Sequence, residues 1–398
     1  MPRRLPSLTV VLVVLMPLLL VLGIWLGGHP RWLPEPVADA LVGSEDRRVA
    51  LDALDTIHDR YYREVPFGKL SDAAIGGAVR DLDDRFSAYL SPREYHVFRE
   101  SLENAFEGIG TAVRGVRQGL RIETVYPGSP AEKAGLKVGD IITHANGRRL
   151  AGLPETAATA VIKGRAGTRV TLRIRRGDRT FTKRVTRERI EIPTVRSRIA
   201  DAGGKRAAYI ALATFGSRKG HVQMAAAIRR AKRRKAKGIV LDLRRNGGGL
   251  ITEAQLVASM FLKGGPIVTT RGRAVKERTL RAIGQPIAGD LPTVVLVDRG
   301  TASASEIVAG ALQDRRRATL VGTRTFGKGV FQEILPLDNG GALDITVGQY
   351  FLPSGRNIGG SGTKPGRGLK PDVRVADDPK TRRDEALDRA LDVLAGKL

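Results

Sequence analysis

The sequence predicts an α/β protein of several domains, preceded by a transmembrane helix. Its 398 residues are more than one hydrophobic core usually holds. A run without charged residues lies near the N-terminus, and in the C-terminal half short apolar runs alternate with helix-like segments. This alternation is typical of βαβ units, in which helices pack over a sheet.

The uncharged run extends from Leu8 to Gly27, shortly after Arg3 and Arg4. About 20 helical residues span ~30 Å, the thickness of the hydrocarbon core of a bilayer. Residues 1–33 are therefore interpreted as a cytoplasmic stub and a single-pass anchor in the cell membrane, with the rest of the chain outside the cytoplasm. The alternative is a cleaved signal, which would leave a secreted or periplasmic protein. The lack of a small-x-small cleavage site favours the anchor.

Two segments of different character follow the anchor. Residues 34–103 are predicted to form a small helical domain, because apolar residues recur there near helical spacing. Residues 104–190 contain short strands instead, and alternating apolar and polar residues at 169–175 indicate a half-buried strand. Ser129 and Pro130 are typical of the N-cap and first residue of a helix between the strands.

The second segment contains the stretches FEGIGTAV, residues 106–113, and PGSPAEKAGLKVGDIITHANG, residues 127–147. Together they resemble a PDZ domain of the circularly permuted bacterial kind. The resemblance implies that the backbone N–H groups of Gly108, Ile109 and Gly110 receive the terminal carboxylate of a peptide, which pairs with the neighbouring strand edge. On their own, these glycines could serve only to permit a tight turn.

Residues 191–376 are predicted to form an α/β core, and residues 377–398 an amphipathic C-terminal helix. The expected strands are 238–243, 293–297, 319–322 and 343–347, and the expected helices are 251–262 and 305–313. Three polar turns follow three consecutive strands, namely RRNGGG (244–249), RGTASASEI (299–307) and TFGKG (325–329). Because ligands of α/β sheets collect at the carboxyl ends of strands, the chemistry is expected at these turns.

The residue types in these turns suit nucleophilic catalysis. A serine at a helix N-terminus lies near free backbone N–H groups, which stabilise a developing oxyanion. The lysine of TFGKG could act as its base if an apolar pocket lowered the lysine pKa from ~10.4 to ~7–8. Taken alone, a serine before a helix is more often a cap and a lysine in a turn is more often solvated, so these motifs do not by themselves establish catalysis.

Longer stretches around these turns resemble the C-terminal processing peptidases, also called tail-specific proteases. GTASASEIVAGALQD (300–314) and GTRTFGKGVFQ (322–332) carry the resemblance, and it extends over roughly residues 49–375. It implies a crotonase-like protease core in which Ser303 is the nucleophile and Lys328 the general base.

The same resemblance implies three further roles. Gln332 orients the lysine amine, and the backbone N–H groups of Ala304 and one of the glycines 247–249 form an oxyanion hole, with Gly249 preferred. No cofactor and no metal are implied. The five histidines are scattered, which makes a zinc site unlikely, and the absence of cysteine excludes disulfides and thiolate chemistry.

Two positions depart from the family pattern. Arg245-Asn246 precedes the glycines of the first turn, and LDDRFSAYL, residues 82–90, stands where the family has LDPHSAYL. Neither departure is expected to touch a catalytic position.

The expected function is that of a serine endopeptidase. It would bind the C-terminal tails of protein or peptide substrates through the PDZ domain and hydrolyse them through an acyl-enzyme, to process or degrade extracytoplasmic proteins. The alternatives are a PDZ scaffold with an inactive core and a non-proteolytic acyl hydrolase. Need for an adaptor protein and self-association into a homo-oligomer stay open.

The net charge of +26 raises the separate question of a nucleic-acid partner. The arginines are spread along the whole chain and no nucleic-acid recognition motif is present. Nucleic acid is therefore not expected as a partner.

Overall fold

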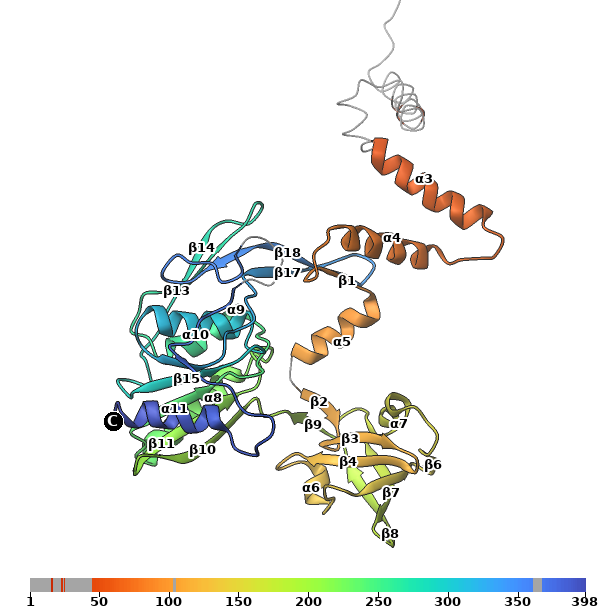
Figure 1. Cartoon of the computed structure of the whole chain (residues 1–398). Coiled ribbons are helices and arrows are strands. Elements are labelled where there is room, and N and C mark those ends of the chain that lie inside the picture. The colour runs from red at the N-terminus through yellow and green to blue at the C-terminus, as the bar shows by residue number, and fades with distance from the viewer. Residues whose placement is uncertain (1–15, 17–22, 24, 26–44, 103–104, 361–366) are drawn as a thin grey trace, which may run out of the picture. The chain divides into compact units, whose positions relative to one another are not determined.

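The computed structural model describes residues 16, 23, 25, 45–102, 105–360 and 367–398, which belong to two compact units, Met1–Leu82 and Asp83–Leu398 (Figure 1). The first unit contains helices α3 (Glu45–Arg60) and α4 (Phe67–Asp81). None of the helices within the described ranges is long and apolar enough to cross a membrane. The predicted anchor, residues 1–33, lies outside the described residues except at positions 16, 23 and 25.

The second unit begins with a short strand and a helix, β1 (Ala88–Leu90) and α5 (Pro92–Leu102), where the sequence predicted only helix. Residues 88–90 are extended because they pair with a strand far along the chain, with Ala88 opposite Asp344. Helical periodicity in the neighbouring sequence could not reveal this pairing.

The PDZ segment forms one small sheet with its own hydrophobic core (Figure 1). The strands are, in spatial order, β3 (Thr111–Val116), β4 (Gly119–Val125), β5 (Ile141–Ala145), β7 (Arg169–Arg176) and β8 (Arg179–Thr186), with β6 (Arg148–Arg149) beside β5. A separate pair joins β2 (Ala105–Gly108) to β9 (Glu188–Glu191). Helices α6 (Pro130–Lys133) and α7 (Glu155–Ile162) complete the segment. The predicted N-cap is confirmed, because the Ser129 side chain accepts a hydrogen bond from the Glu132 N–H.

The core of the second unit is a six-stranded sheet between two layers of helices (Figure 1). Its strands, in spatial order, are β10 (Val195–Ala202), β11 (Lys205–Leu212), β12 (Gly238–Asp242), β15 (Thr293–Val297), β16 (Thr319–Gly322) and β19 (Val373–Arg374). All neighbours from β11 to β19 run parallel. Successive side chains of β12 point to opposite faces of the sheet, so they belong to two different parts of the core. Ile239 and Leu241 pack on the face covered by α8 (Gly220–Arg233), α9 (Ile251–Ser259) and α10 (Ala304–Asp314). Val240 packs on the other face, with α11 (Glu385–Ala395).

A second sheet lies in the same unit and supplies one side of the candidate site. It contains β1, β18 (Ala342–Phe351), β13 (Pro266–Arg271) and β14 (Arg278–Arg281) in that order, and β17 (Val330–Pro336) also pairs with β18. The C-terminal helix begins at Glu385 rather than at Asp377 as predicted. The reason is its cap: the Asp384 side chain accepts from the Leu387 N–H and starts the helix there.

Candidate active site

The three polar turns meet at the carboxyl ends of β12, β15 and β16. The buried Thr301 hydroxyl donates to the Leu243 carbonyl at 2.8 Å, which joins the serine turn to the glycine turn. The Phe326 N–H donates to the Thr301 carbonyl at 3.0 Å, which joins the lysine turn to the serine turn. The parallel sheet therefore brings together segments that are far apart in the sequence.

Ser303 is the residue directly before α10, and its backbone is strained. Its φ of 55° lies in the left-handed region, which non-glycine residues rarely adopt. The side chain is half-buried and so can still be reached. The neighbouring Ser305 is fully buried, and its hydroxyl donates to the Asn246 carbonyl at 2.9 Å. Of the two serines in the SxS motif, Ser303 is thus the accessible one.

The glycine turn lies directly against Ser303. A Cβ added to Gly248, whose φ is 97°, would stand 2.8 Å from the Ser303 Cβ and 2.9 Å from the Ala304 nitrogen. The buried Asn246 holds the turn, since its side-chain oxygen accepts from the Gly248 N–H at 3.0 Å. Only glycine fits this close approach of two backbones.

Two backbone N–H groups beside Ser303 remain available. Ala304 is the first residue of α10, where an N–H has no partner within the helix. Gly249 lies beside Phe215, whose backbone hydrogen bonds go to the residues on either side of Gly249. The Phe215 N–H donates to the Gly248 carbonyl, and the Leu250 N–H donates to the Phe215 carbonyl. Within the described part of the chain, nothing accepts from the Gly249 or Ala304 N–H. Of the three glycines, Gly248 already uses its N–H.

Lys328 is half-buried, and Gln332 holds its amine. The Nζ donates to the Gln332 Oε1 at 2.6 Å, and the Gln332 amide donates to the Thr346 hydroxyl at 2.9 Å. Burial lowers the pKa of Lys328 below its usual value, against the carboxylates of Asp344, Asp84 and Glu306, which raise it. Burial therefore favours the neutral amine that a base requires.

The segment LDDRFSAYL also reaches Lys328, so the expectation that it touches no catalytic candidate is wrong. The Nζ lies 4.6 Å from the centroid of the Phe86 ring. Asp84 accepts from the Phe86 N–H at 2.9 Å and from the Ser87 hydroxyl at 2.6 Å. Although burial raises the pKa of Asp84, these hydrogen bonds lower it on balance. The pairing of β1 with β18 places this segment beside the lysine.

Glu306 connects the serine turn to the lysine turn. Its fully buried carboxylate accepts four hydrogen bonds: on Oε2 from the Ser303 and Lys328 N–H groups at 2.9 and 3.0 Å, and on Oε1 from the Gly327 N–H at 2.8 Å and the Thr325 hydroxyl at 2.5 Å. Burial raises the pKa of Glu306, while these hydrogen bonds lower it.

Glu306 is not among the predicted site residues, although the pattern Ser-x-x-Glu before an apolar helix is a capping-box signal. No direct hydrogen bond joins the Ser303 and Lys328 side chains in the described structure. The two residues are linked through the Glu306 carboxylate instead.

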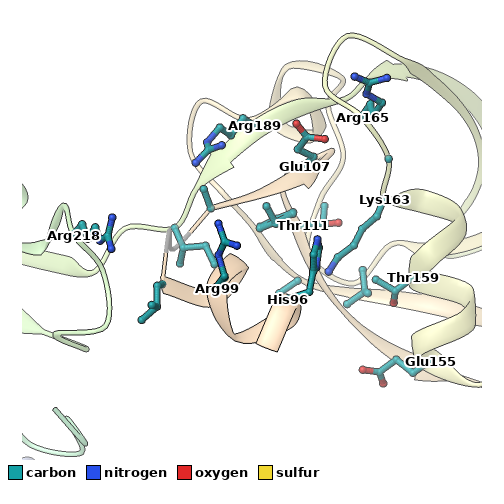
Figure 2. A pocket seen from close by; sticks show the side chains of 17 residues that line it. His96, Arg99, Glu107, Thr111, Glu155, Thr159, Lys163, Arg165, Arg189 and Arg218 are labelled. Carbon is teal, nitrogen blue, oxygen red and sulfur yellow. The ribbon is translucent and has the colours of Figure 1, made fainter. Parts of the chain in front are cut away.

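A groove of about 1120 Å³ is lined mainly by the PDZ segment, with His96, Arg99 and Leu102 of α5 and with Arg218 also at its border (Figure 2). One wall is the start of β3, residues 111–113, and the opposite wall is α7. Strand β3 is an edge of its sheet, so one side of its backbone is open to an added strand. The predicted residues 108–110 do not line the groove: the Ile109 side chain is buried in the PDZ core. Gly110 has a φ of 83°, and a Cβ there would stand 2.2 Å from the Ser129 Cβ.

No group of three or more potential metal ligands of the His, Cys, Asp or Glu type occurs among the residues with a described placement.

Comparison with known proteins relates the chain to proteases. Residues 206–375 match peptidase family S41, and residues 121–176 match the PDZ domain. The chain is 37% identical over 324 residues to a carboxy-terminal-processing protease of Bartonella bacilliformis, which covers 79% of this chain and 73% of that protein. It is 31% identical to a probable CtpA-like serine protease of Staphylococcus haemolyticus, over 81% of this chain but only 64% of that protein. The chain thus spans less than two thirds of the staphylococcal relative.

A solved structure of a candidate S41 protease from Bacteroides fragilis is similar over 85% of this chain and 92% of that chain. The TM-score is 0.51 and the sequence identity is 20%, so this likeness concerns the fold alone.

Proposed function

Because the chain belongs to the carboxy-terminal-processing proteases of peptidase family S41 and is a serine-type peptidase with a PDZ domain, we propose that Ser303 and Lys328 form its catalytic dyad. The observation that carries this proposal is the environment of Lys328. Its amine is half-buried beside Phe86, is held by Gln332, and lies on a turn that one carboxylate ties to the serine turn.

The proposed reaction begins with attack of the Ser303 Oγ on the scissile carbonyl carbon, while its proton passes to the neutral Lys328 Nζ. Gln332 accepts a hydrogen bond from Nζ and so fixes the direction of its lone pair. The carbonyl oxygen becomes an oxyanion and accepts from the N–H groups of Ala304 and Gly249. One such donor typically contributes about 10²–10³-fold in kcat.

The intermediate then collapses. The carbon–nitrogen bond breaks, the leaving amine takes the proton from Lys328, and an acyl-enzyme remains on Ser303. Water attacks the ester and gives a proton to Lys328, and the Ser303 oxygen leaves and recovers that proton. Each proton that the lysine accepts is returned, so the cycle consumes only the peptide and one water molecule.

The PDZ groove is proposed to receive the C-terminal tail of the substrate. A tail added to the edge of β3 would pair with its open backbone, and its carboxylate would lie at the end of the groove that Glu107 and Thr111 line, next to the turn 108–110 that precedes this strand. A more upstream peptide bond of the same chain would then reach Ser303.

We also propose that residues 1–33 anchor the chain in the cell membrane and that its substrates are extracytoplasmic. The support is the uncharged run from Leu8 to Gly27 behind two arginines. N-terminal sequencing of the protein from membranes tests this. The protein is expected to keep its N-terminal residues and to stay in the membrane fraction after carbonate washing. An N-terminus beyond residue 27 would instead show that a signal has been cleaved.

Cleavage of casein, an unstructured protein, tests the dyad. The parent is expected to cleave it, and Ser303→Ala and Lys328→Ala are each expected to lose at least about 10³-fold in kcat/KM. Lys370→Ala, an exposed lysine outside the three turns, is the matched control and should keep full activity. A fluorophosphonate should label Ser303, located by mass spectrometry.

Circular dichroism checks that each variant is folded. Equal cleavage by folded parent and dyad variants would contradict the assignment. Binding of tails without any labelling or cleavage would instead favour an inactive scaffold.

A further inference from the structure

The groove of the PDZ segment is bordered by more cationic than anionic side chains (Figure 2). The cationic residues are Arg99, Lys163, Arg165, Arg189 and Arg218, and the anionic residues are Glu107 and Glu155. A concave site lined by one sign of charge attracts ligands of the opposite sign.

Each of the two carboxylates has a polar neighbour. Glu107 stands directly opposite Arg189 in the pairing of β2 with β9, where side chains approach closely. Glu155 accepts a hydrogen bond from the Gly115 N–H at 2.8 Å, at the far end of β3. Because five cationic side chains stand against two carboxylates, the groove keeps a net positive field.

Lys163 and Arg165 follow α7 in the sequence and border the groove. Lys163 directly follows α7. Its Nζ lies 5.9 Å from the centroid of the Phe106 ring on β2. Phe106 precedes the turn 108–110 by two positions. Both Lys163 and Arg165 are exposed, and neither forms an ion pair with a carboxylate in the described part of the chain. Figure 2 shows Lys163 extending across the groove from the end of α7.

The geometry of strand addition fixes which tail residues meet these cations. A tail whose carboxylate lies at the turn 108–110 must run antiparallel to β3, because this turn precedes β3. Its last residues then lie beside the end of α7, and alternate side chains face the helix. We propose that the groove selects protein tails with Asp or Glu among their last few residues, through Lys163 and Arg165. This inference rests on the proposed function, since it names the class of tail that the same groove binds.

Fluorescence anisotropy of labelled peptides on the full chain tests the selection, with Ser303→Ala present to prevent cleavage. Two peptides share length and an apolar last residue, but one carries Asp and Glu near its end and the other Asn and Gln. The acidic peptide should bind about two- to fivefold more tightly for each ion pair formed, and this advantage should shrink as salt is added.

Variants locate the effect. Lys163→Gln and Arg165→Gln should each remove part of the preference for the acidic peptide, and Lys163→Glu should favour a peptide with lysines instead. The matched control is Lys183→Gln, because Lys183 is exposed on β8, at the opposite edge of the PDZ sheet from β3. It should bind both peptides like the parent.

Each other outcome is decisive. If the Asp/Glu peptide and the Asn/Gln peptide bind equally well, the inference is overturned while tail docking stands. The same follows if the preference for the Asp/Glu peptide is unchanged in Lys163→Gln and Arg165→Gln. If neither free-acid peptide binds better than its C-terminally amidated form, while the Ser303 enzyme still cleaves casein, tail docking itself fails and the inference falls with it. Displacement of the acidic peptide by a short DNA duplex, with DNA the tighter ligand, would assign the groove to nucleic acid instead.

Discussion

Replacement of Glu306 by glutamine should uncouple the serine turn from the lysine turn. The glutamine keeps one oxygen and replaces the other by an amide nitrogen, which cannot accept a hydrogen bond. If the nitrogen stands in place of Oε1, it faces one backbone N–H, that of Gly327. If it stands in place of Oε2, it faces two, those of Ser303 and Lys328. Each buried donor left without an acceptor costs about 1–3 kcal/mol, so the variant should lose roughly 1–6 kcal/mol of stability. Domains are typically stable by about 5–15 kcal/mol, and denaturant unfolding can therefore resolve this loss.

The same change should lower activity beyond the loss of folded protein. A displacement of about 1 Å at a reacting group can cost about 10²-fold in rate, and Glu306 fixes the backbones of both Ser303 and Lys328. The assay is kcat for a chromogenic peptide, measured where circular dichroism shows the variant folded.

Glu253→Gln is the matched control for this measurement. Glu253 is also buried and accepts from the His221 N–H at 3.0 Å, but it contacts neither turn. It should lose stability and keep kcat. Unchanged kcat and stability in Glu306→Gln, or an equal loss of kcat in Glu253→Gln, would refute the reasoning.

Two further predictions concern the lysine and the glycine turn. Asp344→Asn removes a carboxylate that raises the pKa of Lys328, so the amine should lose its proton at lower pH. The acidic limb of the kcat/KM profile should then move to lower pH, and a move to higher pH would contradict this assignment. Gly248→Ala should abolish cleavage, because the new Cβ would collide with Ser303, whereas a Cβ at Gly247 meets open space. Gly247→Ala should therefore cleave normally, and the prediction fails if both variants cleave alike.

The sequence predicted best those elements whose signal is local. The strands 293–297 and 319–322 coincide with β15 and β16, because a short apolar run between polar turns describes a strand buried on both faces. The predicted cap at Ser129 is correct for the same reason, since capping depends on neighbouring residues. The C-terminal helix was predicted to start about two turns too early, because apolar spacing does not show where Asp384 caps it.

Contacts between distant segments could not be predicted in this way. Phe86 reaches Lys328 only because β1 pairs with β18, and no local pattern indicates that pairing. Glu306 carried a local capping signal, but its hydrogen bond to the Lys328 backbone comes from a turn beyond the next strand. The roles proposed for Ser303 and Gln332 stay predictions until the variants are measured.

The position of Phe86 limits how the enzyme can be shortened. The first compact unit ends at Leu82, and the two residues that lie beside the Lys328 amine, Asp84 and Phe86, follow almost at once. A truncated protein that starts at Asp83 keeps both residues and the strand β1. One that starts after Leu90 loses both, and would expose the Lys328 amine to water even though the PDZ segment and the serine turn are complete. A truncated chain that keeps the proposed base covered therefore has to start before Asp84.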